Sequence, residues 1–134
     1  MSHEIEVLEA NEAFYRAFTA RDVGAMDALW ARRAPVACIH PGWDALQGLA
    51  EVLGSFHAIL GSASAPRVHC TVAAAHVVGD TAFVTCHERV QGAMLVATNV
   101  FTLEDGAWRM VHHHSSLLPA PEVRAGPPEA ELRS

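Results

Sequence analysis

Four apolar segments separated by three turns occupy residues 67–116, and this stretch constrains the fold more than any other part of the chain. The turn sequences are Gly79-Asp80, Gln91-Gly92 and Glu104-Asp105-Gly106, each set between segments rich in β-branched residues. Segments joined by such short turns pair with their neighbours along the chain. We therefore predict a four-stranded antiparallel meander.

Three helical segments are predicted before the meander, within residues 3–61. The first has an apolar stripe that includes Val7 and Phe14, with charged residues opposite. Asp22 is expected to cap the second helix, and the third, at about residues 47–60, has the clearest helical period. Helices followed by an antiparallel sheet predict an α+β fold in which the helices cover one face of a curved sheet.

A short strand is predicted at residues 36–40, where Pro41-Gly42 stops it. No internal repeat or linker divides the segments described so far. After Pro119 the composition shifts to Pro, Glu, Ala and Gly, which is typical of a flexible tail. The predicted organisation is one domain, residues 1–118, followed by a Pro-rich tail at residues 119–134.

Composition limits the partners that such a domain can have. Apolar residues make up 51% of the chain and charged residues 18%, below the usual share of about a quarter. The apolar surface that remains predicts a homodimer. Acidic residues outnumber basic ones 15 to 9 and no Lys occurs, so binding to nucleic acid is not expected.

Membrane insertion and secretion are not expected either. No apolar run approaches the roughly 20 residues that span a bilayer. Glutamates near the beginning of the chain are unlike the basic start of a secretory signal. The odd number of cysteines, each in an apolar segment, favours reduced thiols over a disulfide framework. We therefore expect a cytoplasmic protein.

The turn at residues 104–106 decides which side chains of the last strand face the helices, because strand side chains alternate. A two-residue turn would group Asn99 with the even-numbered side chains, among them His112. A three-residue turn, with Gly106 in a left-handed bulge position, would group Asn99 with the odd-numbered side chains, among them His113. Apolar matching across the two strands favours the first turn, and the sequence alone leaves both open.

The order of elements and two segments, CIHPGWDALQG and ATNVFTLEDGAWRMVHHH, resemble the nuclear transport factor 2-like superfamily, which includes SnoaL-like polyketide cyclases and ketosteroid isomerase. The resemblance covers residues 3–118. It implies a cone-shaped α+β half-barrel, with three N-terminal helices packed on a curved, mainly antiparallel sheet around an apolar pocket. It also implies a homodimer formed through the outer sheet face, and a small apolar or aromatic ligand.

The resemblance further implies where the functional side chains lie. Ketosteroid isomerase has a carboxylate base at the end of the short strand, just before a proline, and His40 takes that place before Pro41. SnoaL-like cyclases have a base on the last strand that corresponds to His113, and a pocket histidine on the preceding strand that corresponds to Asn99. This correspondence favours the odd-numbered face of the last strand and the three-residue turn.

Such residues suit proton transfer, because a neutral imidazole can take an acidic proton while an amide donates to a developing enolate oxygen. We predict His40 or His113 as the base, Asn99 as the donor, and His87 as a second acid or proton shuttle. The predicted ligand contacts are Tyr15, Trp43, Phe56, Phe101, Val111 and Ser115. Structural alternatives remain: His40 could hydrogen-bond the turn that follows it, and His87 could be solvated.

No metal or cofactor is predicted. Strand alternation places His113 opposite His112 and His114, and the spacing matches neither a zinc finger nor an HExxH helix. Glycine-rich phosphate loops are also missing from the sequence. The sequence thus predicts a small-molecule pocket protein that acts as a cofactor-independent isomerase, dehydratase or cyclase through histidine acid–base chemistry. The alternative is a non-catalytic ligand-binding or accessory dimerisation domain.

Overall fold

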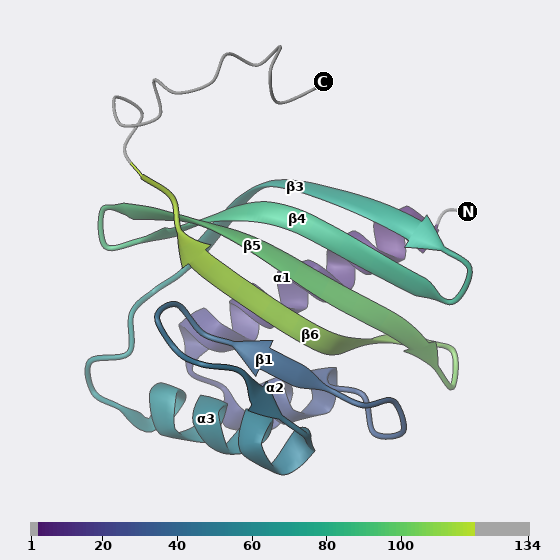
Figure 1. Ribbon diagram of the computed structural model, residues 1–134, viewed down its shortest axis with the longest axis horizontal. Coiled ribbons are helices and arrows are strands. Elements are labelled where there is room, and N and C mark those ends of the chain that lie inside the picture. Colours follow the sequence, from purple (N-terminus) through teal and green to yellow (C-terminus); the bar gives the residue numbers. More distant parts are fainter. Residues whose placement is uncertain (1–2, 120–134) are drawn as a thin grey trace.

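The computed structural model describes residues 3–119, which form three helices and a six-stranded mixed sheet (Figure 1). The helices are α1 (His3–Ala20), α2 (Val23–Leu29) and α3 (Leu49–Gly61). The strands are β1 (Ala37–Ile39), β2 (Leu46–Gln47), β3 (His69–Val78), β4 (Thr81–Val90), β5 (Ala93–Glu104) and β6 (Ala107–Leu117). The predicted tail lies outside the described residues from residue 120 onward.

The sheet has the strand order β2-β1-β6-β5-β4-β3 and does not close into a barrel (Figure 1). Strands β3 to β6 form the predicted antiparallel meander. Strand β1 lies parallel to β6, which makes the sheet mixed, and β2 is a short strand that the sequence pattern did not predict. The α+β fold class is confirmed.

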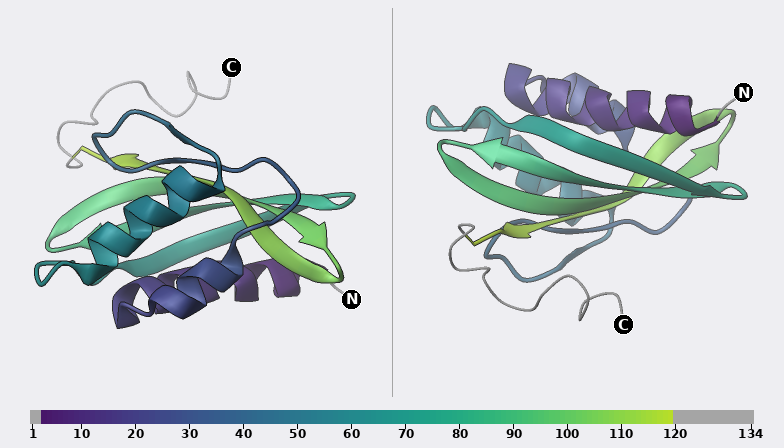
Figure 2. Two further views of the ribbon diagram at one scale, coloured as in Figure 1. Left: turned by 90° about the horizontal axis from the view of Figure 1, so that it is seen from below. Right: turned by 90° about the horizontal axis from the view of Figure 1, so that it is seen from above.

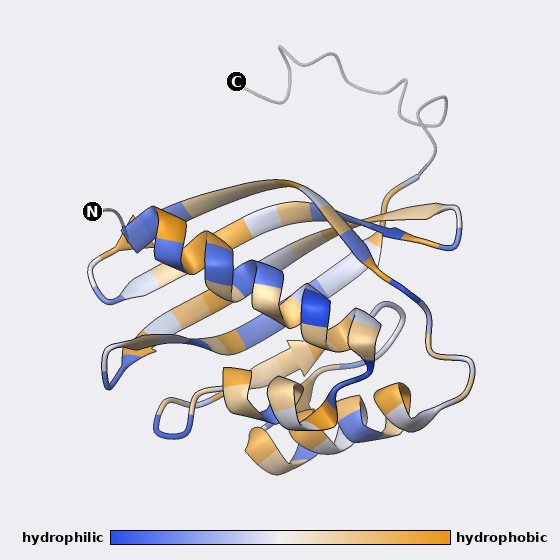
Figure 3. Ribbon diagram, turned by 180° about the vertical axis from the view of Figure 1, so that it is seen from behind, coloured by the Kyte–Doolittle hydropathy of each residue, from blue (hydrophilic) through white to orange (hydrophobic). Residues whose placement is uncertain are grey.

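The three helices bury one face of this sheet, and α1 lies along the meander (Figure 2). Both hydrophilic and hydrophobic residues occur along α1, as the amphipathic pattern requires (Figure 3). Asp22 caps α2 as predicted, because its carboxylate accepts a hydrogen bond of 3.0 Å from the Ala25 backbone nitrogen. Trp30, Phe56 and Met110 are fully buried between the helices and the sheet. Among the described residues, no helix is long and apolar enough to cross a membrane.

The turn between β5 and β6 has two residues, so the three-residue turn favoured by the family resemblance is wrong. Glu104 pairs with Ala107, and the residues between them have positive backbone φ angles, 53° at Asp105 and 79° at Gly106. Two consecutive left-handed residues are the conformation of a type I′ hairpin turn. Asp-Gly is a favoured sequence there because glycine adopts this region without a steric penalty.

A bulge in β6 nevertheless brings the odd-numbered side chains inward. Phe101 pairs with Met110, as apolar matching predicted, whereas Asn99 pairs with His113. The register shifts by one residue between these pairs, which leaves Val111 as the extra residue of β6. Trp108 and Met110 are therefore buried before the bulge, and His113 and Ser115 after it.

Candidate functional site

A pocket of about 310 Å³ opens between α1, the residues that follow β1, and the inner face of the sheet, which is the face that the helices cover. Its volume is at the small end of the range for ligand pockets, roughly 300–1,000 Å³. Most lining side chains are apolar, and the polar ones are two histidines, a tyrosine and a glutamate. The lining residues are Phe14, Tyr15, Phe18, His40, Pro41, Trp43, Ile59, Pro66, Val68, Glu88, Val90, Leu95 and His113.

His113 is held in one orientation by Asn99, which lies directly behind it. The Asn99 amide nitrogen donates to Asn11 Oδ1 at 2.8 Å and to the Tyr15 hydroxyl at 3.0 Å. The amide oxygen therefore faces His113, and it accepts a hydrogen bond of 2.5 Å from His113 Nδ1. Since Nδ1 carries the proton, Nε2 retains a free lone pair.

Asn99 has a different role from the one predicted. Both of its amide hydrogens are directed to protein acceptors, and its side chain is fully buried behind the pocket wall. It therefore orients the His113 imidazole and fixes its tautomer, and its amide hydrogens are already engaged within the protein. The structure does bring Asn99 and His113 together, as the family resemblance implied.

Burial keeps the His113 imidazole neutral. Its side chain is almost inaccessible to solvent, and the loss of hydration lowers its pKa to about 3. The nearby His40, His112 and His114 lower the pKa further through repulsion of the charged form. A neutral imidazole with a free Nε2 is a proton acceptor at neutral pH.

His40 lies in the same pocket, with 6.4 Å between the centres of its ring and that of His113. The Ser55 hydroxyl donates to the Val52 carbonyl at 2.7 Å, so its oxygen accepts the 2.9 Å hydrogen bond from His40 Nε2. The proton of His40 is thus on Nε2, the opposite tautomer from His113. Burial lowers the His40 pKa to about 4, which keeps this imidazole neutral as well.

Glu88 is the acidic group of the pocket, and the sequence did not single it out as a site residue. The Tyr15 hydroxyl donates to Glu88 Oε2 at 2.5 Å, and the Ser115 hydroxyl donates to Oε1 at 2.6 Å. Burial, together with the Glu88 charge, raises the Tyr15 pKa well above its usual range, so the phenol keeps its proton. Burial also raises the pKa of Glu88, and the hydrogen bonds from Ser115 and Tyr15 oppose that shift. Glu88 Oε2 lies 3.9 Å from His113 Nε2.

His87 does not belong to this cluster. It neighbours Glu88 on β4, and successive strand side chains point to opposite faces of a sheet. Glu88 is buried on the inner face, so His87 points to the outer face and cannot shuttle a proton in the pocket. The inward position of Glu88 could have been predicted from the alternation of side chains along β4, because Glu88 follows Val84 and Cys86 at every second residue.

Two of the six predicted ligand contacts line the pocket, Tyr15 and Trp43. Trp43 is 48% exposed and its ring packs edge-on against His40, so it forms part of the pocket mouth. The other four predicted contacts do not line the pocket: Phe56, Phe101, Val111 and Ser115. Ser115 reaches the site through Glu88, and Phe56 supports the His40 ring at a centre-to-centre distance of 4.9 Å.

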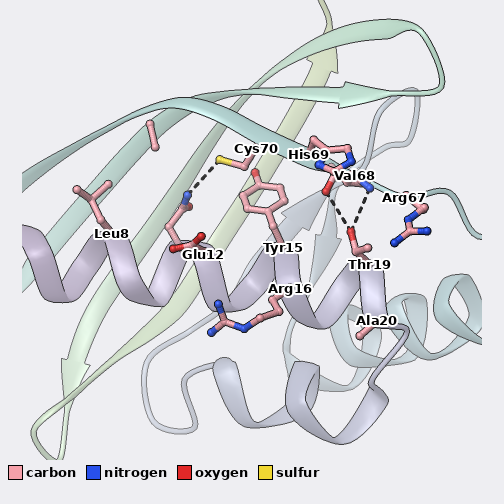
Figure 4. A pocket seen from close by; sticks show the side chains of 12 residues that line it. Leu8, Glu12, Tyr15, Arg16, Thr19, Ala20, Arg67, Val68, His69 and Cys70 are labelled. Atoms are coloured by element: carbon pink, nitrogen blue, oxygen red, sulfur yellow. Dashed lines mark hydrogen bonds between the residues drawn. The ribbon is translucent and has the colours of Figure 1, made fainter.

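A second hollow, an open groove of about 670 Å³, lies between α1 and the beginning of β3 (Figure 4). It shares Tyr15 and Val68 with the pocket. Two of its lining residues are hydrogen-bonded, because the Asn11 amide nitrogen donates to Cys70 Sγ at 3.6 Å, so the groove borders the same polar network. Within residues 3–119, no three His, Cys, Asp or Glu side chains are placed to hold a metal ion.

The family model for the SnoaL-like domain matches residues 7–121. Among solved structures, a candidate dehydratase of the NTF2-like family from Streptomyces avermitilis is 34% identical to this chain, with a TM-score of 0.81. The match covers 88% of this chain and 97% of that one. A candidate calcium/calmodulin-dependent protein kinase type II association domain from Thiobacillus denitrificans is also 34% identical, with a TM-score of 0.73 over 82% of this chain and 93% of that one.

A curated relative, the F-box protein SKIP8 of Arabidopsis thaliana, is 30% identical over 114 residues. The match covers 84% of this chain and 49% of that protein, so the chain spans about half the length of this relative. The names of these relatives cover different activities. The comparisons therefore support a shared fold, and the chemistry has to be argued from the pocket.

Proposed function

Because this chain belongs to the SnoaL-like domain family, we propose that it uses its pocket for cofactor-independent proton transfer on a small apolar or aromatic molecule. The reaction class is isomerisation, dehydration or cyclisation, each of which begins with removal of an acidic proton. His113 is the base. The observation that carries the proposal is the His113–Asn99 hydrogen bond, which leaves Nε2 unprotonated on a residue that lines the pocket.

Proton transfer to His113 would create an imidazolium in an apolar site, which is unfavourable without a counter-charge. Glu88 supplies that charge, since its Oε2 lies 3.9 Å from His113 Nε2. The hydroxyls of Tyr15 and Ser115 hold the carboxylate in place. A positioned base of this kind typically contributes about 100-fold to 10,000-fold in rate.

His40 is the second acid–base group of the proposal. Its ring lines the same pocket as His113, and its Nε2 proton is held by Ser55. Since the free ring nitrogen of His40 carries no proton, it can accept one from another atom of the ligand, while the His113 imidazolium returns the proton that it has removed. Isomerisation and dehydration both need this second transfer.

Exchange of ligand C–H protons for deuterium tests the proposal without knowledge of the natural substrate. Cyclic ketones and hydroxylated aromatic compounds are incubated with the protein in D₂O and followed by proton NMR. The wild type should accelerate exchange for at least one compound, and His113→Ala should reduce the rate by about 100-fold or more. His87→Ala, on the outer face, is the matched control and should leave the rate unchanged. Exchange that persists in His113→Ala would rule out His113 as the base.

A second candidate function is assembly without catalysis, with a homodimer formed through the outer sheet face. It is favoured by the relative described as a kinase association domain and by apolar side chains exposed on that face, Phe83 at 39% and Val96 at 37%. This function predicts no exchange of ligand protons in any variant, whether or not a ligand binds in the pocket. The two candidate functions are compatible, since the pocket and the outer face lie on opposite sides of the sheet.

A further inference from the structure

The pocket contains one carboxylate and no fixed positive charge. Neither Lys nor Arg occurs among its lining residues, and burial keeps both His40 and His113 neutral. Glu88 is 5% exposed, and the loss of hydration that raises the pKa of its carboxyl leaves the charged form poorly stabilised by water. A buried carboxylate without a counter-ion favours a ligand that brings positive charge or strong hydrogen-bond donors.

The atoms that face the pocket from this cluster are acceptors. His113 Nε2 has a lone pair because the proton is on Nδ1, and Glu88 Oε2 is a carboxylate oxygen. The 3.9 Å between them is too long for a hydrogen bond and leaves two acceptors side by side. A ligand N–H or O–H group can donate to Glu88 Oε2 and so lie beside His113 Nε2, whereas a second carboxylate would be repelled.

The rest of the pocket suits the apolar part of such a ligand. Phe14, Phe18 and Trp43 line it together with aliphatic side chains. Aromatic rings bury apolar surface and attract cations through their electron-rich faces. At about 310 Å³, the pocket admits a molecule of roughly one ring with a short substituent.

We propose that the pocket is selective for small apolar amines in their protonated form, with the ammonium group on the Glu88 carboxylate and His113 Nε2 free to take a proton from a neighbouring carbon, and that it rejects carboxylates of the same size. This inference rests on the proposed function, because it assigns a ligand class to the same pocket. The carboxylate of Glu88 sets the charge preference, Tyr15 and Ser115 hold that carboxylate, and the aromatic walls set the size.

Three probes of similar size and different charge test the inference: benzylamine, benzyl alcohol and benzoate. Their dissociation constants are measured at pH 7 by isothermal titration calorimetry, with NMR shift changes locating the binding site. For the wild type we expect benzylamine to bind most tightly. Benzyl alcohol should have a dissociation constant at least about tenfold higher, and benzoate should show no measurable binding. Glu88→Gln keeps the size of the side chain and should weaken benzylamine binding by about tenfold or more, while benzoate gains.

His87→Gln is the matched control, one residue away on the opposite face, and should leave all three affinities unchanged. If Glu88→Gln does not fold, the ranking of the three probes on the wild type still decides the inference. Benzoate binding as tight as benzylamine binding would overturn the charge preference and leave the pocket as a binding site. If no probe binds the wild type, the inference fails, and the proton-exchange assay on cyclic ketones decides the proposed function separately.

Discussion

The chemical character of His113 is set by a neighbour that cannot turn. Asn99 is fully buried and has each side-chain polar atom engaged, the oxygen by His113 and the nitrogen by Asn11 and Tyr15. Rotation of the amide would bring two donors, or two acceptors, face to face. The tautomer of His113 therefore follows from a hydrogen-bond network that begins on helix α1.

Asn99→Ala should lower the free energy of unfolding by about 1–3 kcal/mol, because it leaves the buried His113 Nδ1–H without an acceptor. It should also reduce proton exchange through loss of the fixed tautomer. Urea unfolding and the exchange assay check the two effects. Thr98→Ala, on the neighbouring outward position of β5, is the control and should change stability by less than about 1 kcal/mol. Equal effects of the two substitutions would contradict the assigned role of Asn99.

The lowered pKa of His113 also predicts how stability depends on pH. The unfolded chain binds a proton at this residue below about pH 6.5, whereas the folded chain does so only near pH 3, where the pKa lies. The unfolded state therefore binds more protons in this window, and the free energy of unfolding falls as the pH drops below 6.5.

His113→Gln removes this contribution. Its unfolding free energy should decrease less steeply between pH 6.5 and 5, by about 1.4 kcal/mol per pH unit, than that of the wild type. Chemical denaturation of both proteins at several pH values gives the two slopes, and other titrating groups cancel in the comparison. Parallel slopes would show that His113 is not a buried neutral imidazole.

Sequence and resemblance predicted part of this site. His40 before Pro41, and His113 with Asn99, are the pairings that the resemblance implied, and they lie together in the structure. Glu88 could have been found from the period of two along β4. Asn11 had no such signal, because a single amide in a helix stripe acquires its role only from the strand packed against it.

In the β5–β6 hairpin, apolar matching and the family resemblance gave opposite answers, and each was correct in part. Apolar matching correctly indicated a two-residue turn, whereas the resemblance correctly indicated the inward face of His113. The bulge at Val111 reconciles them. Nothing in the local sequence marks a bulge, because Val111 is an ordinary strand residue and the bulge depends on what the two halves of β6 have to pack against.

The turn itself can be tested with a pair of glycines. Gly106 has φ of 79°, where an added Cβ is strained although no neighbouring atom lies within 4 Å. Gly106→Ala should therefore lower the free energy of unfolding by about 1–2 kcal/mol. Gly54→Ala, in α3 with equally open space and an ordinary helical backbone, should leave stability unchanged or raise it by up to about 1 kcal/mol. Thermal unfolding distinguishes the two, and destabilisation by both would contradict the backbone argument.

For the whole molecule, the outer sheet face is the surface expected to bring two copies together. Phe83 and Val96 lie on adjacent strands of this face and are partly exposed. A charge in the centre of an apolar interface is desolvated without a partner, so Phe83→Glu or Val96→Glu should convert the predicted dimer into a monomer.

Light scattering coupled to size-exclusion chromatography gives the mass directly. Ile5→Glu, at a position on α1 that is 59% exposed, is the matched control and should leave the mass unchanged. A monomeric wild type, or a dimer that survives both outer-face substitutions, would contradict dimerisation through this face.

The central claim is that His113 presents an unprotonated Nε2 to the pocket at neutral pH. Long-range proton–nitrogen NMR correlations of the ¹⁵N-labelled imidazole report both its charge and its tautomer. We predict a neutral ring with the proton on Nδ1 from pH 7.5 down to 5, since the His113 pKa is lowered to about 3. A ring that becomes an imidazolium near pH 6.5, or that carries its proton on Nε2, would contradict the proposed base and the pocket chemistry built on it.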